Sequence, residues 1–256
     1  MNTKLLMLAG ALLLVSGCAS FSGPPRPPEA VLEKGRVGLL LEMPEQVVHT
    51  HVGTTVFNNF SREYDFDPNL TQDFKRHLSE HLVEVGLEPV VIENSALAGF
   101  DGHVVGLREA TWSIANEADS VGEIRSQNRL DALIRVWPIK RHLVAMECSN
   151  MGCNDRYAEG PGLYTRGIFG LLQSMAVPGV GYEVILFEPL FNLASYKPLR
   201  SIEGFGSRAT LIEDFKRPDD LKNLSDAELR AVRDAIAARL EDLAEAIAVG
   251  LTTVPE

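Results

Sequence analysis

The sequence lacks the common catalytic signatures. It contains no G-x-S-x-G elbow, no P-loop and no G-x-G-x-x-G fingerprint. It is also short of basic residues, because 24 Lys and Arg against 35 Asp and Glu give a formal net charge of −11 at pH 7. An acidic chain does not attract nucleic-acid phosphates or anionic lipid headgroups. We therefore expect no nucleic-acid partner, no cofactor and no enzymatic activity.

Long apolar runs are missing too, apart from one at the N-terminus. Leu5–Val15 is too short to span a bilayer and has the length of a signal-peptide core, with Lys4 as the only charge before it. The following Val15-Ser16-Gly17-Cys18 resembles a lipobox, the site that lipoprotein signal peptidase cleaves after a diacylglyceryl group joins the cysteine. We predict that residues 1–17 are a signal peptide and that Cys18 is lipidated. The alternative is an ordinary secreted protein with a chance cysteine.

The predicted lipid decides the location that we expect. Two or more acyl chains, such as diacylglyceryl and palmitate, hold a protein durably on a membrane. Ala19 follows the cysteine. In lacking an aspartate at this position, the sequence resembles lipoproteins that are sorted to the outer membrane and face the periplasm. Residues 18–33 are rich in proline and predict an extended tether. Residues 34–256 are expected to form a single globular domain, since 45% hydrophobic and 23% charged residues suit a folded protein.

Cysteine is scarce, with only Cys148 and Cys153 besides Cys18. Outside the cytoplasm, two nearby cysteines most often form a disulfide, and we predict one here. The alternative is a metal site, which needs two more ligands that the neighbouring sequence does not offer.

The hydrophobic pattern predicts an α/β or α+β fold, with helices packed on a mixed sheet. Leu70, Phe74, Leu78 and Leu82 form one apolar stripe of a helix over residues 69–85. Ser225 and Glu228 form a capping box that opens a long C-terminal helix, for which Gly250 is the expected stop. A further helix is predicted over residues 119–129. The expected strands are 36–42, 47–57, 87–93, 131–137, 142–148, 182–190 and 201–211. The first two of these are expected to pair with each other.

Two histidine patterns invite a metal-site hypothesis. His77-Leu78-Ser79-Glu80-His81 matches the H-x-x-E-H of inverted zinc proteases, which makes a metal-dependent hydrolase an alternative function. The adjoining apolar stripe favours boundary residues beside a core instead. His49 and His51 lie two apart on a predicted strand, hence on one face. One alternative is that these two histidines belong to a metal site, and the other, which we predict, is that they face solvent. His103 and His142 belong to no specific pattern.

An uncharged segment runs from Gly167 to Tyr182. Its middle is predicted to form a short helix that is apolar nearly all round. One interpretation is an insertion that completes the core. The sharper one is an exposed element that contacts the bilayer or a partner, and a third is the lining of a pocket that carries a small apolar ligand. The contact residues would be Tyr164, Ile168, Phe169, Leu171, Leu172 and Met175.

The order of elements resembles the periplasmic α/β domain shared by the amino-terminal part of the Tol-system translocation protein and the curli-secretion lipoprotein group. The similar features are an early strand, the helix and strand over residues 70–93, the strand 131–137 and the long terminal helix. Thr55-Val56-Phe57-Asn58-Asn59 loosely resembles that family's early Phe-x-Asn. The cysteine loop and the apolar insertion depart from it. The resemblance implies binding to other envelope proteins, and our leading hypothesis is a non-catalytic envelope lipoprotein that binds or assembles with them.

Overall fold

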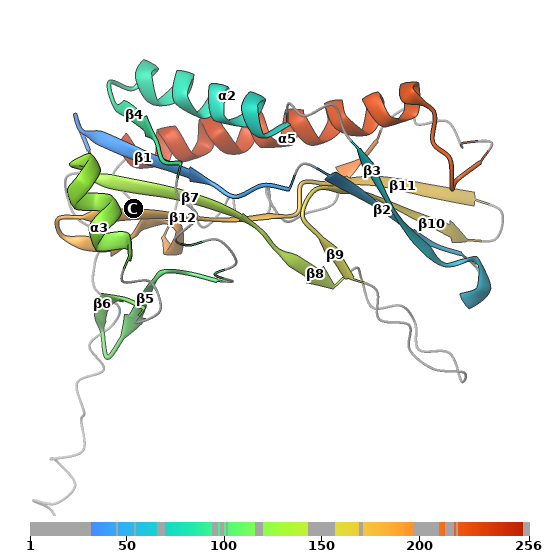
Figure 1. Ribbon diagram of the computed structural model, residues 1–256, viewed down its shortest axis with the longest axis horizontal. Helices are drawn as coiled ribbons and strands as arrows, with labels where there is room; N and C mark the ends of the chain where they lie inside the picture. The colour runs from blue at the N-terminus through green and yellow to red at the C-terminus, as the bar shows by residue number, and fades with distance from the viewer. Residues whose placement is uncertain are drawn as a thin grey trace, which may run out of the picture.

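The chain forms two five-stranded mixed sheets placed end to end, with two helices along one side of them (Figure 1). The structure is a computed structural model. It describes residues 32–44, 46–53, 55–65, 70–93, 97, 100, 102–115, 120–142, 157–168, 171–196, 210–212, 218 and 220–252.

Sheet A carries the longest buried strands. In spatial order its strands are β13 (Leu190–Asn192), β12 (Val180–Phe187), β7 (Ala132–Pro138), β1 (Arg36–Leu41) and β4 (Glu88–Val91). β1 is parallel to both β7 and β4, whereas β12 is antiparallel to β7 and to β13. The central strands are buried on both faces, which explains their nearly continuous apolar sequences.

Sheet B continues from sheet A along the long axis of the molecule. Its strands are β14 (Thr210–Leu211), β11 (Leu171–Val177), β10 (Gly162–Ile168), β2 (Gln46–Val52) and β3 (Phe60–Asp65). β10 is parallel to β2, and the other pairs are antiparallel. A single 3₁₀ turn, η1 (Val56–Asn58), connects β2 to β3.

Prolines mark the junction between the two sheets. The chain passes from β1 to β2 at Pro44 and from β11 to β12 at Pro178. Pro138 and Pro161 flank a small ladder that leaves from the same place, formed by β8 (Lys140–His142) and β9 (Tyr157–Glu159). Since proline donates no backbone hydrogen bond, it suits these breaks between ladders.

Two helices cover one side of the sheets. α2 (Leu70–Glu84) packs on α5 (Asp226–Thr252), and α5 also contacts β10 and β11. The capping box opens α5 as predicted: the backbone N–H of Ser225 donates to Glu228 at 2.7 Å, and the backbone N–H of Glu228 donates to Ser225 Oγ at 3.4 Å. The buried residues of α5 share one core with residues of both sheets.

Sheet A has a second core on its opposite face. There, α3 (Ser120–Asn128) and the hairpin of β5 (Val105–Arg108) and β6 (Thr111–Ile114) cover the sheet. The members of this core are Leu40, Ile92, Leu97, Val104, Val105, Val121, Ile124, Leu130, Leu133, Ile185 and Phe187. Sheet A is therefore covered by other elements on both faces.

The expected mixed sheet with packed helices and a long C-terminal helix is confirmed, as are the helices predicted over 69–85 and 119–129. The pairing predicted for the first two strands is wrong: β2 pairs with β3 and β10, because Pro44 lies at a junction between sheets and not in a hairpin. The predicted helix within residues 167–182 is also wrong, since β10 and β11 form an antiparallel hairpin there. Gly250 does not end α5, which continues to Thr252. Of the strand predicted over residues 201–211, only 210–211 lie among the described residues.

Candidate functional site

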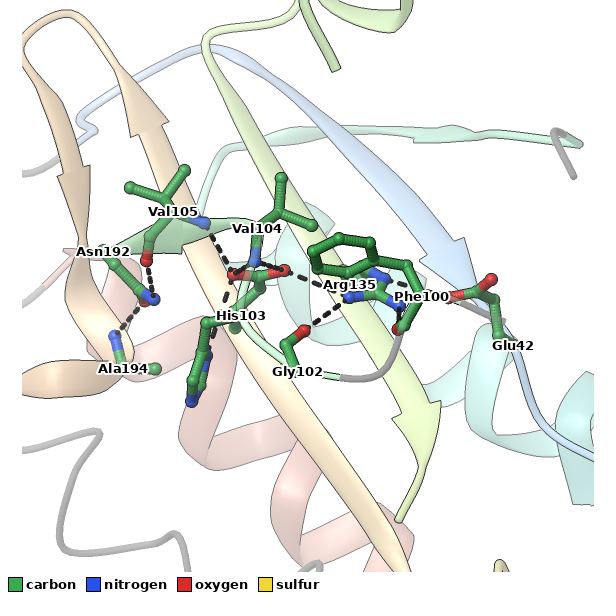
Figure 2. A network of polar contacts seen from close by, with 10 residues as sticks. Glu42, Phe100, Gly102, His103, Val104, Val105, Arg135, Asn192 and Ala194 are labelled. Atoms are coloured by element: carbon green, nitrogen blue, oxygen red, sulfur yellow. Dashed lines mark hydrogen bonds and ion pairs between the residues drawn. The ribbon is translucent and has the colours of Figure 1, made fainter. Parts of the chain in front are cut away.

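A buried pair of opposite charges lies on the face of sheet A that α3 covers, the face of Leu133 and Ile185 (Figure 2 shows Arg135 and its contacts). Arg135 of β7 and Glu183 of β12 are directly paired across the two strands, and both side chains are 0% exposed. Their Nη1 and Oε1 atoms lie 3.5 Å apart. A buried charge is tolerated when it is paired and hydrogen-bonded, and both conditions hold here.

Each member of the pair also binds the backbone of residues 100–105, the segment that leads into β5. Both oxygens of Glu183 accept the N–H of Val104, at 3.0 and 3.1 Å, and one accepts the N–H of Val105 at 3.4 Å. Arg135 donates to the carbonyls of Gly102, at 2.8 Å, and Phe100. In Figure 2, dashed lines join Arg135 to Phe100 and Gly102, so side-chain hydrogen bonds hold this segment against the sheet.

Glu42 gives the cluster an excess of negative charge. Its Oε2 accepts from Arg135 Nε at 2.9 Å, so that one guanidinium faces two carboxylates. Burial raises the pKa of Glu42, while Arg135 opposes the rise and Glu183 adds to it. The other oxygen, Oε1, is buried without a hydrogen-bond partner.

His103 is the exposed member of the cluster. Its Nδ1 lies 3.8 Å from Glu183 Oε2, and its side chain is 56% exposed. The imidazole packs edge-on against Trp137 at 5.4 Å, and the guanidinium of Arg135 lies 4.6 Å from the same indole ring. The carboxylate of Glu183 is fully buried and accepts from the N–H groups of Val104 and Val105 beside Arg135, so it holds this segment in place.

Two histidines form a second buried polar cluster, on sheet B. His49 Nε2 and His51 Nδ1 each lie 2.7 Å from Thr165 Oγ1 on the neighbouring strand β10. Their shared face was predicted correctly. The prediction that they face solvent is wrong, because His49 is 0% exposed and His51 is 6% exposed.

The two histidines are buried by the adjacent strand β3 and by a segment that is distant in the sequence. Phe60 of β3 packs against both rings at 5.1 Å. The residues before α5 lie over β3, where Arg62 and Tyr64 donate to the carbonyl of Lys222 at 2.5 and 2.9 Å. We call residues 220–224 the strap.

The hydroxyl between the two imidazoles can donate to one ring and accept from the other, which satisfies Nε2 of His49 and Nδ1 of His51 when both rings are neutral. Burial lowers the pKa of His49 to about 4, and repulsion from His51 adds to the effect. The backbone of Leu221 in the strap opposes part of this pKa shift, although Nδ1 of His49 makes no hydrogen bond of normal geometry. Leu221 is therefore a near neighbour of this nitrogen and not its hydrogen-bond partner.

The H-x-x-E-H residues lie on α2 beside α5. His77 Nδ1 is 3.8 Å from both Glu80 and Glu241, and His81 Nδ1 is 3.1 Å from Glu84. Among the described residues, no group of three or more His, Cys, Asp or Glu side chains is placed to hold a metal ion.

The predicted contact residues divide between interior and surface. Tyr164 is buried with Val52 and Val177, and Met175 packs against this small cluster. Leu172 is half-buried. Ile168 and Leu171 are the last paired residues of the β10–β11 hairpin. Phe169, Cys18, Cys148 and Cys153 lie outside the described residues.

Sequence reasoning missed three parts of these sites. Arg135 is the only charged residue in the apolar stretch 132–137, and Glu183 is the only one in the stretch 182–187. A single charge inside an apolar strand was the available signal. His103 carried no signal at all. Phe57 was noted only for its resemblance, yet its side chain is 93% exposed.

Within the part of the chain that the structure describes, no helix is long and apolar enough to cross a membrane. No protein-family model, curated protein or solved structure matches this chain.

Proposed function

We propose that this protein is a non-catalytic component of the bacterial envelope, anchored by a lipid on Cys18, that binds or assembles with another envelope protein. The observation that carries the proposal is the presentation of Phe57. A phenylalanine that is 93% exposed leaves nearly its whole ring in water, so packing within the described fold does not account for an apolar residue at this position.

The backbone that carries Phe57 is held in place by hydrogen bonds of its neighbours. The N–H of Asn58 donates to Thr55 at 3.0 Å, and the side chain of Asn59 accepts from the N–H of Gly53 at 2.9 Å. The turn is therefore fixed by hydrogen bonds before any partner arrives. Aromatic side chains carried on a fixed backbone are typical anchors of protein interfaces, because only a few side-chain torsions lose their freedom on binding.

The polar groups that most resemble catalytic residues make contacts within the protein. Arg135 and Glu183 hold residues 100–105, and the two buried histidines share Thr165 under the strap. These contacts give Arg135, Glu183 and the histidine nitrogens that face Thr165 a structural role, so the proposal rests on the surface around Phe57.

The test uses the full chain in a bacterial envelope. Labelled fatty acid should be incorporated, and Cys18→Ser should abolish the labelling. Reversible chemical cross-linking followed by purification from solubilised membranes should yield a discrete complex. Turnover of a substrate by the purified protein, or a chain that carries no lipid and forms no complex, would contradict the proposal.

A further inference from the structure

The end of sheet B farthest from β1 carries Phe57 together with the end of the β10–β11 hairpin. β10 runs parallel to β2, with Arg166 paired to Val52, so both strands end at the same edge. The two connections are neighbours, since a Cβ added to Gly167 would lie 3.9 Å from the Cα of Gly53. We call this end, defined by η1, Ile168 and Leu171–Leu172, the tip.

The two sequence segments that form the tip carry no charge on a strongly acidic chain, and Arg166, paired with Val52, is the charged residue that borders them on β10. No charged residue occurs from Gly53 to Ser61 or from Gly167 to Tyr182, although the whole chain carries −11. Exposed Phe57 and half-buried Leu172 are the apolar side chains that the structure describes there. An uncharged apolar patch is recognised by an uncharged apolar socket, and it offers no ion pairs to a charged partner.

The anchor enters at the opposite end of the molecule. β1 begins at Arg36 and runs toward the junction, and β2 continues from the junction to the tip (Figure 1). Residues 36–52 cover at most about 56 Å at about 3.3 Å per residue. The described chain begins at Leu32, and the part of the tether before it, residues 18–31, reaches at most about 43 Å at about 3.1 Å per residue. To place the tip on the anchoring bilayer, the tether would have to run back along most of the body.

Laying the body flat on the bilayer is also unfavourable. The two helices α2 and α5 together carry 9 Asp and Glu against 5 Lys and Arg, so their surface is net negative even though several carboxylates pair with a basic neighbour. A leaflet that contains anionic lipid repels such a surface. Both arguments direct the tip away from the anchoring membrane.

We propose that the tip is the docking surface, and that its partner is an envelope protein presenting an uncharged apolar socket on the side away from the anchoring membrane. This inference rests on the proposed function and adds the surface, the chemistry of the partner and the orientation. Phe57 is the central side chain, and Leu172 contributes the adjoining contact.

The experiment is photo-cross-linking of the full lipidated chain in living cells, with a photoreactive residue at Phe57, Leu172 or Val83. Val83 is the matched control, because it is 61% exposed and apolar but lies on α2, near β4 at the anchor end. Probes at Phe57 and Leu172 should form a protein adduct whose linked partner peptide is apolar and uncharged. The probe at Val83 should not form it.

A second variant tests the role of Phe57 directly. Phe57→Ser should lower the yield of the Leu172 adduct about tenfold or more, as expected for an interface anchor. Val83→Ser should leave that yield within about twofold. Neither substitution should alter the melting temperature, because both side chains project into solvent.

The outcomes separate this inference from the proposed function. Lipid adducts at the tip, an adduct with a second copy of this chain, or a charged partner peptide would overturn the docking inference. So would a cross-linked complex that forms normally with Phe57→Ser, although the binding role itself would stand. If no complex forms by any method, both proposals fail.

Discussion

The carbonyl oxygen of Gly160 lies so close to Gly179 that no Cβ fits at position 179. Gly179 also has a φ of +64°, which disfavours any residue with a side chain. This contact closes the junction, where Ile139 donates its N–H to Gly179 at 2.9 Å. The close approach of the sheets therefore requires glycine at this position.

Gly179→Ala should destabilise the protein by at least about 2 kcal/mol, from the left-handed conformation and the steric overlap together. Gly122→Ala is the matched control. Gly122 lies inside α3 with open space around it, and alanine there should stabilise by about 1 kcal/mol. Urea denaturation of both variants measures the difference. Equal effects would show that the junction does not constrain position 179.

Arg135→Met should cost about 3–5 kcal/mol, because it leaves the carboxylates of Glu42 and Glu183 without their shared cation. Arg76→Met is the control, since Arg76 pairs with Glu80 on the exposed face of α2 and should cost less than about 1 kcal/mol. Unfolding free energies from denaturant titrations compare them. A cost for Arg135→Met no larger than that of the control would contradict the described network.

Stability should fall on acidification because of His49. Its pKa is 6.5 in a model peptide and about 4 when folded, so the unfolded chain takes up this proton first as the pH falls. The stabilising contribution of neutral His49 is complete above pH 6.5 and is lost toward pH 4, by up to about 3 kcal/mol. The measurement is the unfolding free energy across that window.

A matched pair of variants isolates this effect from other titrating groups. His49→Gln should flatten the pH dependence relative to the native chain. His81→Gln, at a half-buried position beside Glu84, should leave most of it in place. A native chain that loses no more stability than His49→Gln between pH 6.5 and 4 would refute the assignment to His49.

The β5–β6 hairpin should become more stable with a different turn. Glu109 and Ala110 connect the two strands with φ values of 48° and 63°, a conformation that suits Asn-Gly. Replacing the pair by Asn-Gly should therefore stabilise the protein by about 1 kcal/mol. Thermal denaturation detects this gain, and an unchanged or lower melting temperature would count against the described turn.

Local patterns predicted much of the fold. The stripe of α2 follows from helical spacing, and the α5 cap follows from Ser225 and Glu228, because both depend on residues within a few turns of each other. The pairing of β2 depends on partners such as Gly162, far along the chain, and no local pattern contains that information.

The polar clusters were harder to predict for a related reason. Alternation placed His49 and His51 on one face of a strand, but the strap that buries this face lies about 170 residues later in the sequence. Arg135 and Glu183 show a charge inside each apolar strand, yet their pairing follows only from the β7–β12 register. Burial by a distant segment determines the environment of the two histidines, and strand register determines the pairing of Arg135 with Glu183.

The position of α5 in the shared core determines how the molecule gains and loses its structure. Its buried residues complete a core that includes Val37 of sheet A and Leu163 of sheet B. A chain synthesised from its amino end contains all the strands that the structure describes before it contains this helix, so that core closes only after α5 has been made. Once it has closed, loss of α5 exposes both sheets at the same time, and the two sheets should unfold in a single cooperative transition.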